Sequence, residues 1–274
     1  MKRLFFLTFV VLLLFFVNCS KKTDSDKIKI VATIEPIKFI SEQIIKDKGI
    51  ASSIISSNQD PHSLELVPLN MKSVETADIV FFLGSNLEFE EKNSQAIIDN
   101  SKNTLFVFLS EGIDSVFNPH IWVSLKNLKI IAKMICEEIS HYDEENRDYY
   151  SDNYHKYVSR LDSIEKSLSD AIEKRKLKSF FADHIAFSYF ARDYSLEQIA
   201  IFEEGKEPSL KDISQIVGRI KLDKDKILIM TNLSSSRFAD IFRNETQCEI
   251  VYFNPLVADI ADEFLKLTDF LKNE

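Results

Sequence analysis

The stretch DEENRDYYSDNYHKYVSRLDSIEKSLSDAIEKRK, residues 143–176, decides how this chain is organised. Apolar side chains recur in it every three or four residues, which is the spacing of one buried face of an α-helix. Neither proline nor glycine interrupts it. About thirty helical residues extend roughly 45 Å, which is more than one domain needs. We therefore expect a rigid helix over 143–177 that joins two lobes. The apolar side chains are Tyr150, Tyr154, Tyr157, Leu161, Ile164, Leu168 and Ile172.

Short apolar runs alternate with helical patterns on both sides of this helix. Strands that are apolar throughout and separated by helices are typical of parallel sheets covered on both faces. The sequence thus predicts an α/β protein with two lobes, 28–142 and 178–274, and about four strands in each. The predicted strands are 28–33, 50–56, 78–83, 104–109, 179–182, 196–202, 226–231 and 249–253.

The first nineteen residues indicate export. The basic pair Lys2-Arg3 precedes an apolar run, 4–17, that is short for a transmembrane helix and fits the core of a secretory signal peptide. Cys19 then resembles the lipidated cysteine of a bacterial lipoprotein. We expect 1–18 to be a signal peptide and 19–27 to be a lipidated tether at the periplasmic or extracytoplasmic face of a membrane. Cleavage elsewhere, with Cys19 incidental, is the alternative.

The composition excludes some partners. The formal net charge is −9 over 274 residues. Nucleic acids require a basic face, so an acidic chain argues against them, whereas it is compatible with attracting cations. Glycine-rich phosphate loops are absent, since the chain has only 5 glycines. Cys136 and Cys248 are expected to be two separate buried thiols, with a disulfide as the alternative.

Three histidines stand where strands end. His62 follows the second strand of the first half, His120 follows the fourth, and His184 follows the first strand of the second half. Ligand sites in α/β proteins lie beyond the carboxyl ends of strands, so we expect the three to meet between the lobes. Neutral imidazoles bind divalent ions such as zinc or manganese. Loop or cap histidines without a ligand role are the alternative, and we also assign no ligand role to His141 and His155, which lie in charged helical segments.

A metal-binding histidine is held in one tautomer by an acceptor on its other ring nitrogen. Asp60 and Asp183 are candidates for this role because they are close to His62 and His184 in sequence. Glu35, at the end of the first strand, is a third candidate. His184 also opens a predicted helix, 184–194, whose dipole disfavours the imidazolium form and keeps the ring free to bind.

Four short motifs resemble those of the zinc/manganese solute-binding lipoproteins of bacterial ABC transporters, the cluster A-I metal-binding proteins. The likeness covers the whole mature chain in the same order, including the long helix. It implies two similar lobes, each a four-stranded parallel sheet flanked by helices, with one metal ion between them. It also implies a monomer that works with a transporter permease. The motifs are Asp60-Pro61-His62, Pro119-His120-Ile121-Trp122, HIAFSYF at 184–190, and Glu207-Pro208-Ser209.

The chain departs from the family pattern at its usual carboxylates. Asn118 stands where the family usually has aspartate, two residues before the second histidine. The usual fourth ligand, a carboxylate after the last strand, is replaced by Asn254, which binds weakly or leaves the place to water. Asn232 stands where a glutamate is common and is a further candidate for supporting the ligands. The histidine-rich loop of many zinc-specific members is missing from 110–117.

These features favour an extracytoplasmic binding protein, not an enzyme, that delivers a divalent metal ion to an ABC permease. Three imidazoles suit tetrahedral zinc, whereas manganese would want the missing carboxylate, so zinc is favoured and manganese is the alternative. A surface adhesin with a structural or vestigial metal site is a second reading. A three-histidine zinc hydrolase is a third, but the chain has no H-E-x-x-H motif and no nucleophile elbow.

Overall fold

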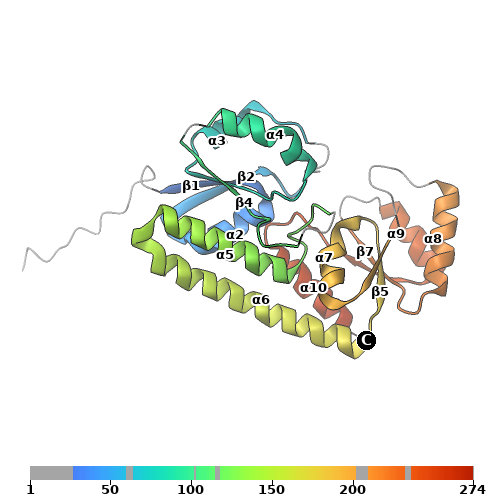
Figure 1. The fold of residues 1–274 in the computed structure, drawn as a ribbon. Helices are drawn as coiled ribbons and strands as arrows, with labels where there is room; N and C mark the ends of the chain where they lie inside the picture. Colours follow the sequence, from blue (N-terminus) through green and yellow to red (C-terminus); the bar gives the residue numbers. More distant parts are fainter. Residues whose placement is uncertain are drawn as a thin grey trace, which may run out of the picture.

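Two parallel sheets, one in each half of the chain, are joined by the long helix α6 (Arg147–Arg175). The computed structural model describes residues 27–59, 64–101, 103–114, 118–201, 209–231 and 236–273. Figure 1 shows the two lobes side by side with α6 running beneath both. The predicted α/β class with two four-stranded sheets is confirmed. The helix begins at Arg147 and not at residue 143, because Glu144–Asn146 forms a separate 3₁₀ turn.

The first lobe has the strand order β2-β1-β3-β4, with every neighbouring pair parallel. Figure 1 shows α3 and α4 above this sheet and α2 and α5 below it. Proline stands in the first turn of α2 and of α3, where its missing N–H costs no helical hydrogen bond. The elements are β1 (Ile28–Ile34), α2 (Glu35–Ile45), β2 (Gly49–Ile55), α3 (Pro68–Glu75), β3 (Ile79–Phe82), α4 (Glu88–Asp99), β4 (Leu105–Phe108) and α5 (Leu125–Tyr142).

The second lobe repeats this arrangement, with the order β6-β5-β7-β8 and all pairs parallel. In each lobe the strand order reverses between two central strands, β1 and β3 or β5 and β7. Crevices at such reversals bind ligands in open α/β sheets. The elements are β5 (Ser179–Ala182), α7 (Ser188–Tyr194), β6 (Glu197–Ala200), α8 (Leu210–Leu222), β7 (Ile227–Met230), α9 (Ser236–Thr246), β8 (Glu249–Tyr252) and α10 (Ile260–Lys272).

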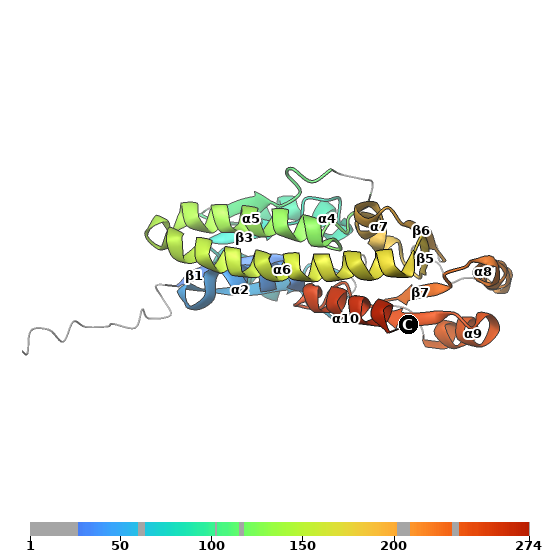
Figure 2. The ribbon, with the colours of Figure 1, turned by 90° about the horizontal axis from the view of Figure 1, so that it is seen from below.

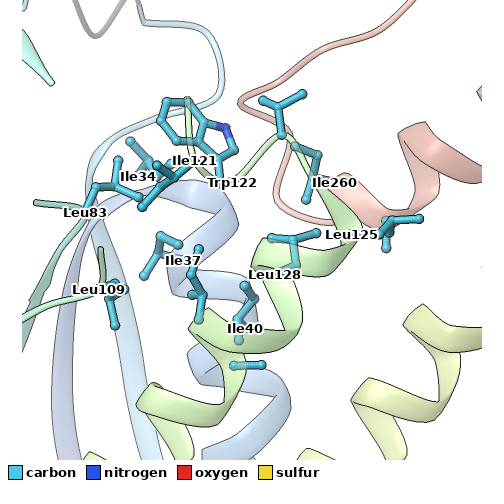
Figure 3. Close-up of a cluster of buried hydrophobic side chains, with 14 of the residues drawn as sticks. Ile34, Ile37, Ile40, Leu83, Leu109, Ile121, Trp122, Leu125, Leu128 and Ile260 are labelled. Atoms are coloured by element: carbon cyan, nitrogen blue, oxygen red, sulfur yellow. The ribbon is translucent and has the colours of Figure 1, made fainter. Parts of the chain in front are cut away.

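One hydrophobic core extends through both lobes. Figure 3 shows Ile37 of α2, Leu128 of α5 and Ile260 of α10 in the same cluster as Trp122. Helix α6 contacts α2, α5 and α10, so it is packed against both lobes along its length (Figure 2). The face that the sequence predicts is the buried one, with Tyr154 only partly buried. The buried apolar residues of α6 are Tyr150, Tyr157, Leu161, Ile164, Leu168, Ala171 and Ile172.

The outer face of the second sheet has a core of its own. Phe181, Leu228 and Met230 of the sheet pack there against Phe242 of α9. Cys248 belongs to this cluster, while Cys136 lies in the larger core. Both are free thiols, as the sequence predicts, and burial raises the pKa of each. None of the helices in the described ranges has both the length and the apolar character to cross a membrane.

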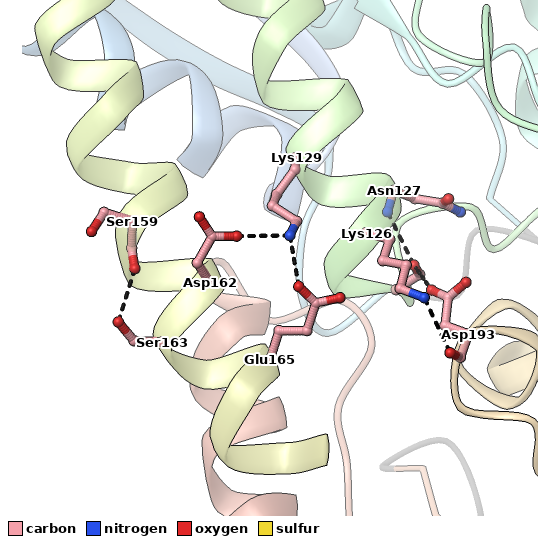
Figure 4. A network of polar contacts seen from close by, with 9 residues as sticks. Lys126, Asn127, Lys129, Ser159, Asp162, Ser163, Glu165 and Asp193 are labelled. Atoms are coloured by element: carbon pink, nitrogen blue, oxygen red, sulfur yellow. Dashed lines mark hydrogen bonds and ion pairs between the residues drawn. The ribbon is translucent and has the colours of Figure 1, made fainter. Parts of the chain in front are cut away.

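Polar contacts tie the start of α5 to the second lobe. Ser124 caps α5, because its Oγ accepts from the backbone N–H of Asn127 at 3.0 Å. The same hydroxyl donates to the Asp193 carboxylate at the end of α7. One turn further along α5, the Lys129 ammonium lies 2.7 Å from an Asp162 oxygen and 2.6 Å from a Glu165 oxygen of α6 (Figure 4). These bonds connect α5, α6 and α7 where the lobes meet.

Candidate metal site

His120 and His184 meet between the lobes. His120 lies in the loop between β4 and α5, and His184 directly follows β5. Their Nε2 atoms are 3.0 Å apart, and their ring planes are inclined at 85°. His120 is 2% exposed, so its ring is almost fully withdrawn from water. Two histidines that are 64 residues apart in sequence thus direct nitrogen atoms at the same point.

Asn118 fixes the orientation of the His120 ring. Its Oδ1 lies 2.7 Å from His120 Nδ1 and also accepts from the His120 backbone N–H at 2.8 Å. An amide oxygen can only accept, so Nδ1 carries a proton, and in the neutral ring the lone pair is then on Nε2, which faces His184. In the sequence, Asn118 stands out only as a departure from a family pattern, and this role was not predicted. Its place two residues before His120 was the available signal.

His184 lies at the switch point of the second sheet. The predicted helix over 184–194 is interrupted: Ile185–Phe187 forms a 3₁₀ turn, and α7 follows from Ser188. The carbonyl of His184 accepts from Gln198 Nε2 at 2.9 Å. The neighbouring Asp183 is buried, and its Oδ2 accepts from the backbone N–H and the hydroxyl of Thr231 at 2.7 and 3.0 Å. This carboxylate therefore joins the ends of β5 and β7 beside the histidine.

Trp122 connects the histidine loop to the loop that holds Asn254. Its ring centroid lies 5.1 Å from that of His120, and its indole N–H donates to the Pro255 carbonyl at 2.7 Å. The Asn254 side-chain oxygen accepts from the backbone N–H of Leu256 at 2.9 Å. Asn254 is thus in the loop packed beside the site, with its oxygen already engaged in a local turn.

The other predicted site residues fall into two groups. Glu35 accepts from Ser53 of β2 at 2.6 Å and from Lys38 at 3.3 Å, which are contacts within the first lobe. Cys19, Asp60, His62 and Asn232 lie outside the described residues. Within the ranges that are described, no three His, Cys, Asp or Glu side chains gather into a group that could hold a metal ion.

A buried carboxyl group of the first lobe, which is not among the predicted site residues, connects two strand ends near the histidine loop. Glu90 is 4% exposed, and burial raises its pKa. It accepts from the Thr33 hydroxyl at 2.5 Å and from the backbone N–H groups of Leu83 and Gly84 at 2.7 and 2.8 Å. It therefore joins the ends of β1 and β3. Ser85, the residue after Gly84, donates to the Pro119 carbonyl at 2.6 Å. Pro119 lies directly before His120.

The fold defines a two-lobed α/β protein in which two histidines face each other between the lobes. A family model described as the zinc-uptake complex component A, periplasmic (ZnuA), matches residues 30–273. The chain belongs to the ZnuA family. It is accordingly a metal solute-binding protein of an ABC transporter and not an enzyme, as the sequence predicts.

Relatives that are named for different metals are about equally similar to this chain. The high-affinity zinc uptake system protein ZnuA of Bacillus subtilis is 26% identical over 259 residues, covering 86% of this chain and 81% of the relative. The manganese ABC transporter substrate-binding lipoprotein PsaA of Streptococcus mitis is 29% identical over 286 residues, covering 96% and 92%. The iron ABC transporter substrate-binding lipoprotein MtsA of Streptococcus pyogenes serotype M1 is 30% identical over 234 residues, covering 77% and 74%.

Solved structures agree with the fold. A crystal structure of ZnuA superposes with a TM-score of 0.82 at 26% identity, covering 90% of this chain and 99% of that one. A crystal structure of the metal-dependent lipoprotein YcdH from Bacillus subtilis gives a TM-score of 0.78, also at 26% identity, covering 89% and 98%. Two lobes joined by one long helix are therefore the architecture that this chain shares with its relatives.

Proposed function

We propose that this protein binds one zinc ion between its lobes and delivers it to the permease of an ABC transporter. His62, His120 and His184 supply three nitrogen ligands, and Asn254 or a water molecule completes the shell. The observation that carries the proposal is the 3.0 Å separation of the His120 and His184 Nε2 atoms. Two nitrogen ligands of a tetrahedral zinc ion lie roughly 3.3 Å apart, so the rings need to move little to admit the ion.

The residues around the histidines support neutral ligands. Asn118 holds His120 in the tautomer that exposes the Nε2 lone pair. Asp183, through its bonds to Thr231, orders the segment beside His184, and Asp60 and Asn232 are proposed to act in the same way. The contacts of Glu35 to Ser53 of β2 and Lys38 of α2 lie within its own lobe and speak against an orienting role.

Zinc is favoured over manganese because the proposed ligands are imidazoles without a carboxylate. Zinc accepts four-coordinate sites made mainly of nitrogen, whereas manganese binds such sites more weakly and prefers oxygen ligands. The relatives are named for zinc, manganese or iron, so similarity alone does not select the metal ion. The choice of zinc for this chain rests on its own ligand residues.

The direct test is titration of purified, metal-free protein against a chelator of known affinity. We expect zinc to bind with a dissociation constant below about 1 μM and manganese to bind at least about 100-fold more weakly. Binding of neither ion below about 1 μM would contradict the proposal and would favour the adhesin reading with a vestigial site.

We further propose that residues 1–18 are a signal peptide and that Cys19 carries lipid. Residues 19–27 then tether a monomer, with lobes 28–142 and 178–274 on either side of the helix region 143–177. The anchor holds the site outside the cytoplasm, where the transporter receives its ion.

The anchor predicts a clear effect of Cys19→Ser. The acyl chains attached at Cys19 provide the membrane affinity, so the variant is expected to leave the membrane fraction and to incorporate no labelled palmitate. Cys136→Ser is the matched control, because this buried thiol lies in the protein core and its loss should leave both readouts unchanged. Membrane association and labelling of Cys19→Ser at the parent's level would contradict the anchor.

A further inference from the structure

Asn118 is bonded to both lobes at once. Besides accepting from His120, its side-chain Nδ2 donates to the Ile185 carbonyl at 2.6 Å and to Ser188 Oγ at 3.0 Å. Its backbone carbonyl accepts from the Tyr189 hydroxyl at 2.9 Å. The residue is 6% exposed. One buried side chain therefore contacts the histidine of the first lobe and the segment that follows the histidine of the second.

The hydrogen bonds continue until they reach His184. Ser188 Oγ lies 3.2 Å from Gln198 Oε1, and Gln198 Nε2 donates to the His184 carbonyl at 2.9 Å. With the contact between the two imidazoles, a closed ring forms through His120, Asn118, Ser188, Gln198 and His184. A displacement of either lobe at this point changes the environment of both histidines.

The bond across the lobes needs an amide. An aspartate at 118 would have the same shape and would accept from His120 at least as well, because a carboxylate is the stronger acceptor. It would have no hydrogen for the Ile185 carbonyl, which lies 2.6 Å from Nδ2, so two oxygen atoms would face each other at that distance. Orienting His120 therefore does not require asparagine, whereas the bond to the Ile185 carbonyl does.

We propose that Asn118 couples the orientation of His120 to the contact between the lobes, and thereby controls how fast the metal ion leaves. This inference rests on the proposed binding of zinc by the two histidines. When the lobes separate at Ile185, the Asn118 amide loses the acceptors of its N–H groups and is free to turn away from His120. The lobe contact and the orientation of the His120 ring are then lost together. Asn118 is a positioning residue, since it acts on the ion through His120.

The variant Asn118→Asp separates the two roles. We expect zinc to dissociate at least about 10-fold faster, as measured by stopped-flow transfer to a chelator, although the acceptor for His120 is retained. We also expect amide hydrogen exchange over 185–190 to be at least about 10-fold faster in the metal-free protein. Unchanged or slower dissociation together with unchanged exchange would show that Asn118 only orients the ring, and would overturn the proposal.

Asn153→Asp is the matched control. Asn153 is also buried, and its Nδ2 donates to a backbone carbonyl, that of Ile44, at 3.0 Å within the first lobe's packing against α6. The chemical change is the same, but both rates should stay within about 2-fold of the parent. Equal acceleration in this variant would mean that any buried asparagine has the effect, and would contradict a specific role of Asn118.

A second variant keeps the test decisive if Asn118→Asp does not fold. Ser188→Ala removes one acceptor of the Asn118 amide and should accelerate exchange and zinc release in the same direction by a smaller factor. No change in either rate would then overturn the proposal. Failure of the parent protein to bind zinc would instead contradict the proposed function, while exchange in metal-free protein still reports the lobe contact.

Discussion

Replacing His120 or His184 by alanine is expected to weaken zinc binding by about 100-fold or more. Four-ligand zinc sites bind with about 10–16 kcal/mol at pH 7, so one ligand contributes roughly 3 kcal/mol. At 1.4 kcal/mol for each factor of ten, its loss corresponds to about two orders of magnitude in the dissociation constant. Each variant is measured by competition with a chromophoric chelator at fixed pH. His62→Ala should show a loss of the same size.

His155→Ala is the control for these variants. His155 is exposed on α6 and lies among charged residues, so its removal should leave the zinc affinity at the parent's value. Thermal unfolding of each metal-free variant shows whether the fold is retained. If the His120 and His184 variants fold and still bind zinc as the parent does, the facing pair is not the binding site.

Glu90→Ala is expected to lower the free energy of unfolding by about 3 kcal/mol. The carboxylate is the acceptor for two backbone N–H groups and one hydroxyl at the ends of β1 and β3. Each buried donor left without an acceptor costs about 1–3 kcal/mol. Urea unfolding measures the loss. Glu91→Ala, an exposed position on the same helix, should change stability by less than about 0.5 kcal/mol.

The same carboxyl group predicts a pH dependence. Because burial raises the pKa of Glu90 in the folded state, its proton stabilises the fold below about pH 4.5, and this contribution is lost as the pH rises through the folded-state pKa. Glu90→Gln cannot ionise. Its free energy of unfolding should therefore fall less than the parent's between pH 4.5 and 7. If the free energies of unfolding of the two proteins changed with pH in parallel, the pH dependence could not be assigned to Glu90.

The fold could be predicted because its signals are local. The apolar face of α6, the strand runs and the Ser124 cap each depend on residues within one element, and the strand ends agree with the sequence prediction to within two residues. The exception is the helix predicted from His184, which begins as a 3₁₀ turn. The order of the strands in each sheet is decided by long-range packing and was not predicted.

The support of the site could not be predicted for the same reason. The acceptors of the Asn118 amide lie 67 and 70 residues away, and Glu90 meets Thr33 at a separation of 57. In sequence, Glu90 is one of three acidic residues in the first turn of α4, and nothing distinguishes the buried one from the others. The histidines were found because their places after strands are a local pattern, whereas the groups that hold them belong to distant segments.

The shared core limits how far the two halves can be treated as modules. Both lobes have the same strand order, which suggests that a lobe from one relative could be exchanged for that of another to alter metal preference. Yet a single hydrophobic core passes through both, and α6 supplies part of it to each. A chimera would bring together helix faces that evolved against different partners. Exchanging a lobe therefore requires exchanging the matching face of α6 as well. The smallest segment that can be exchanged between relatives is larger than a lobe.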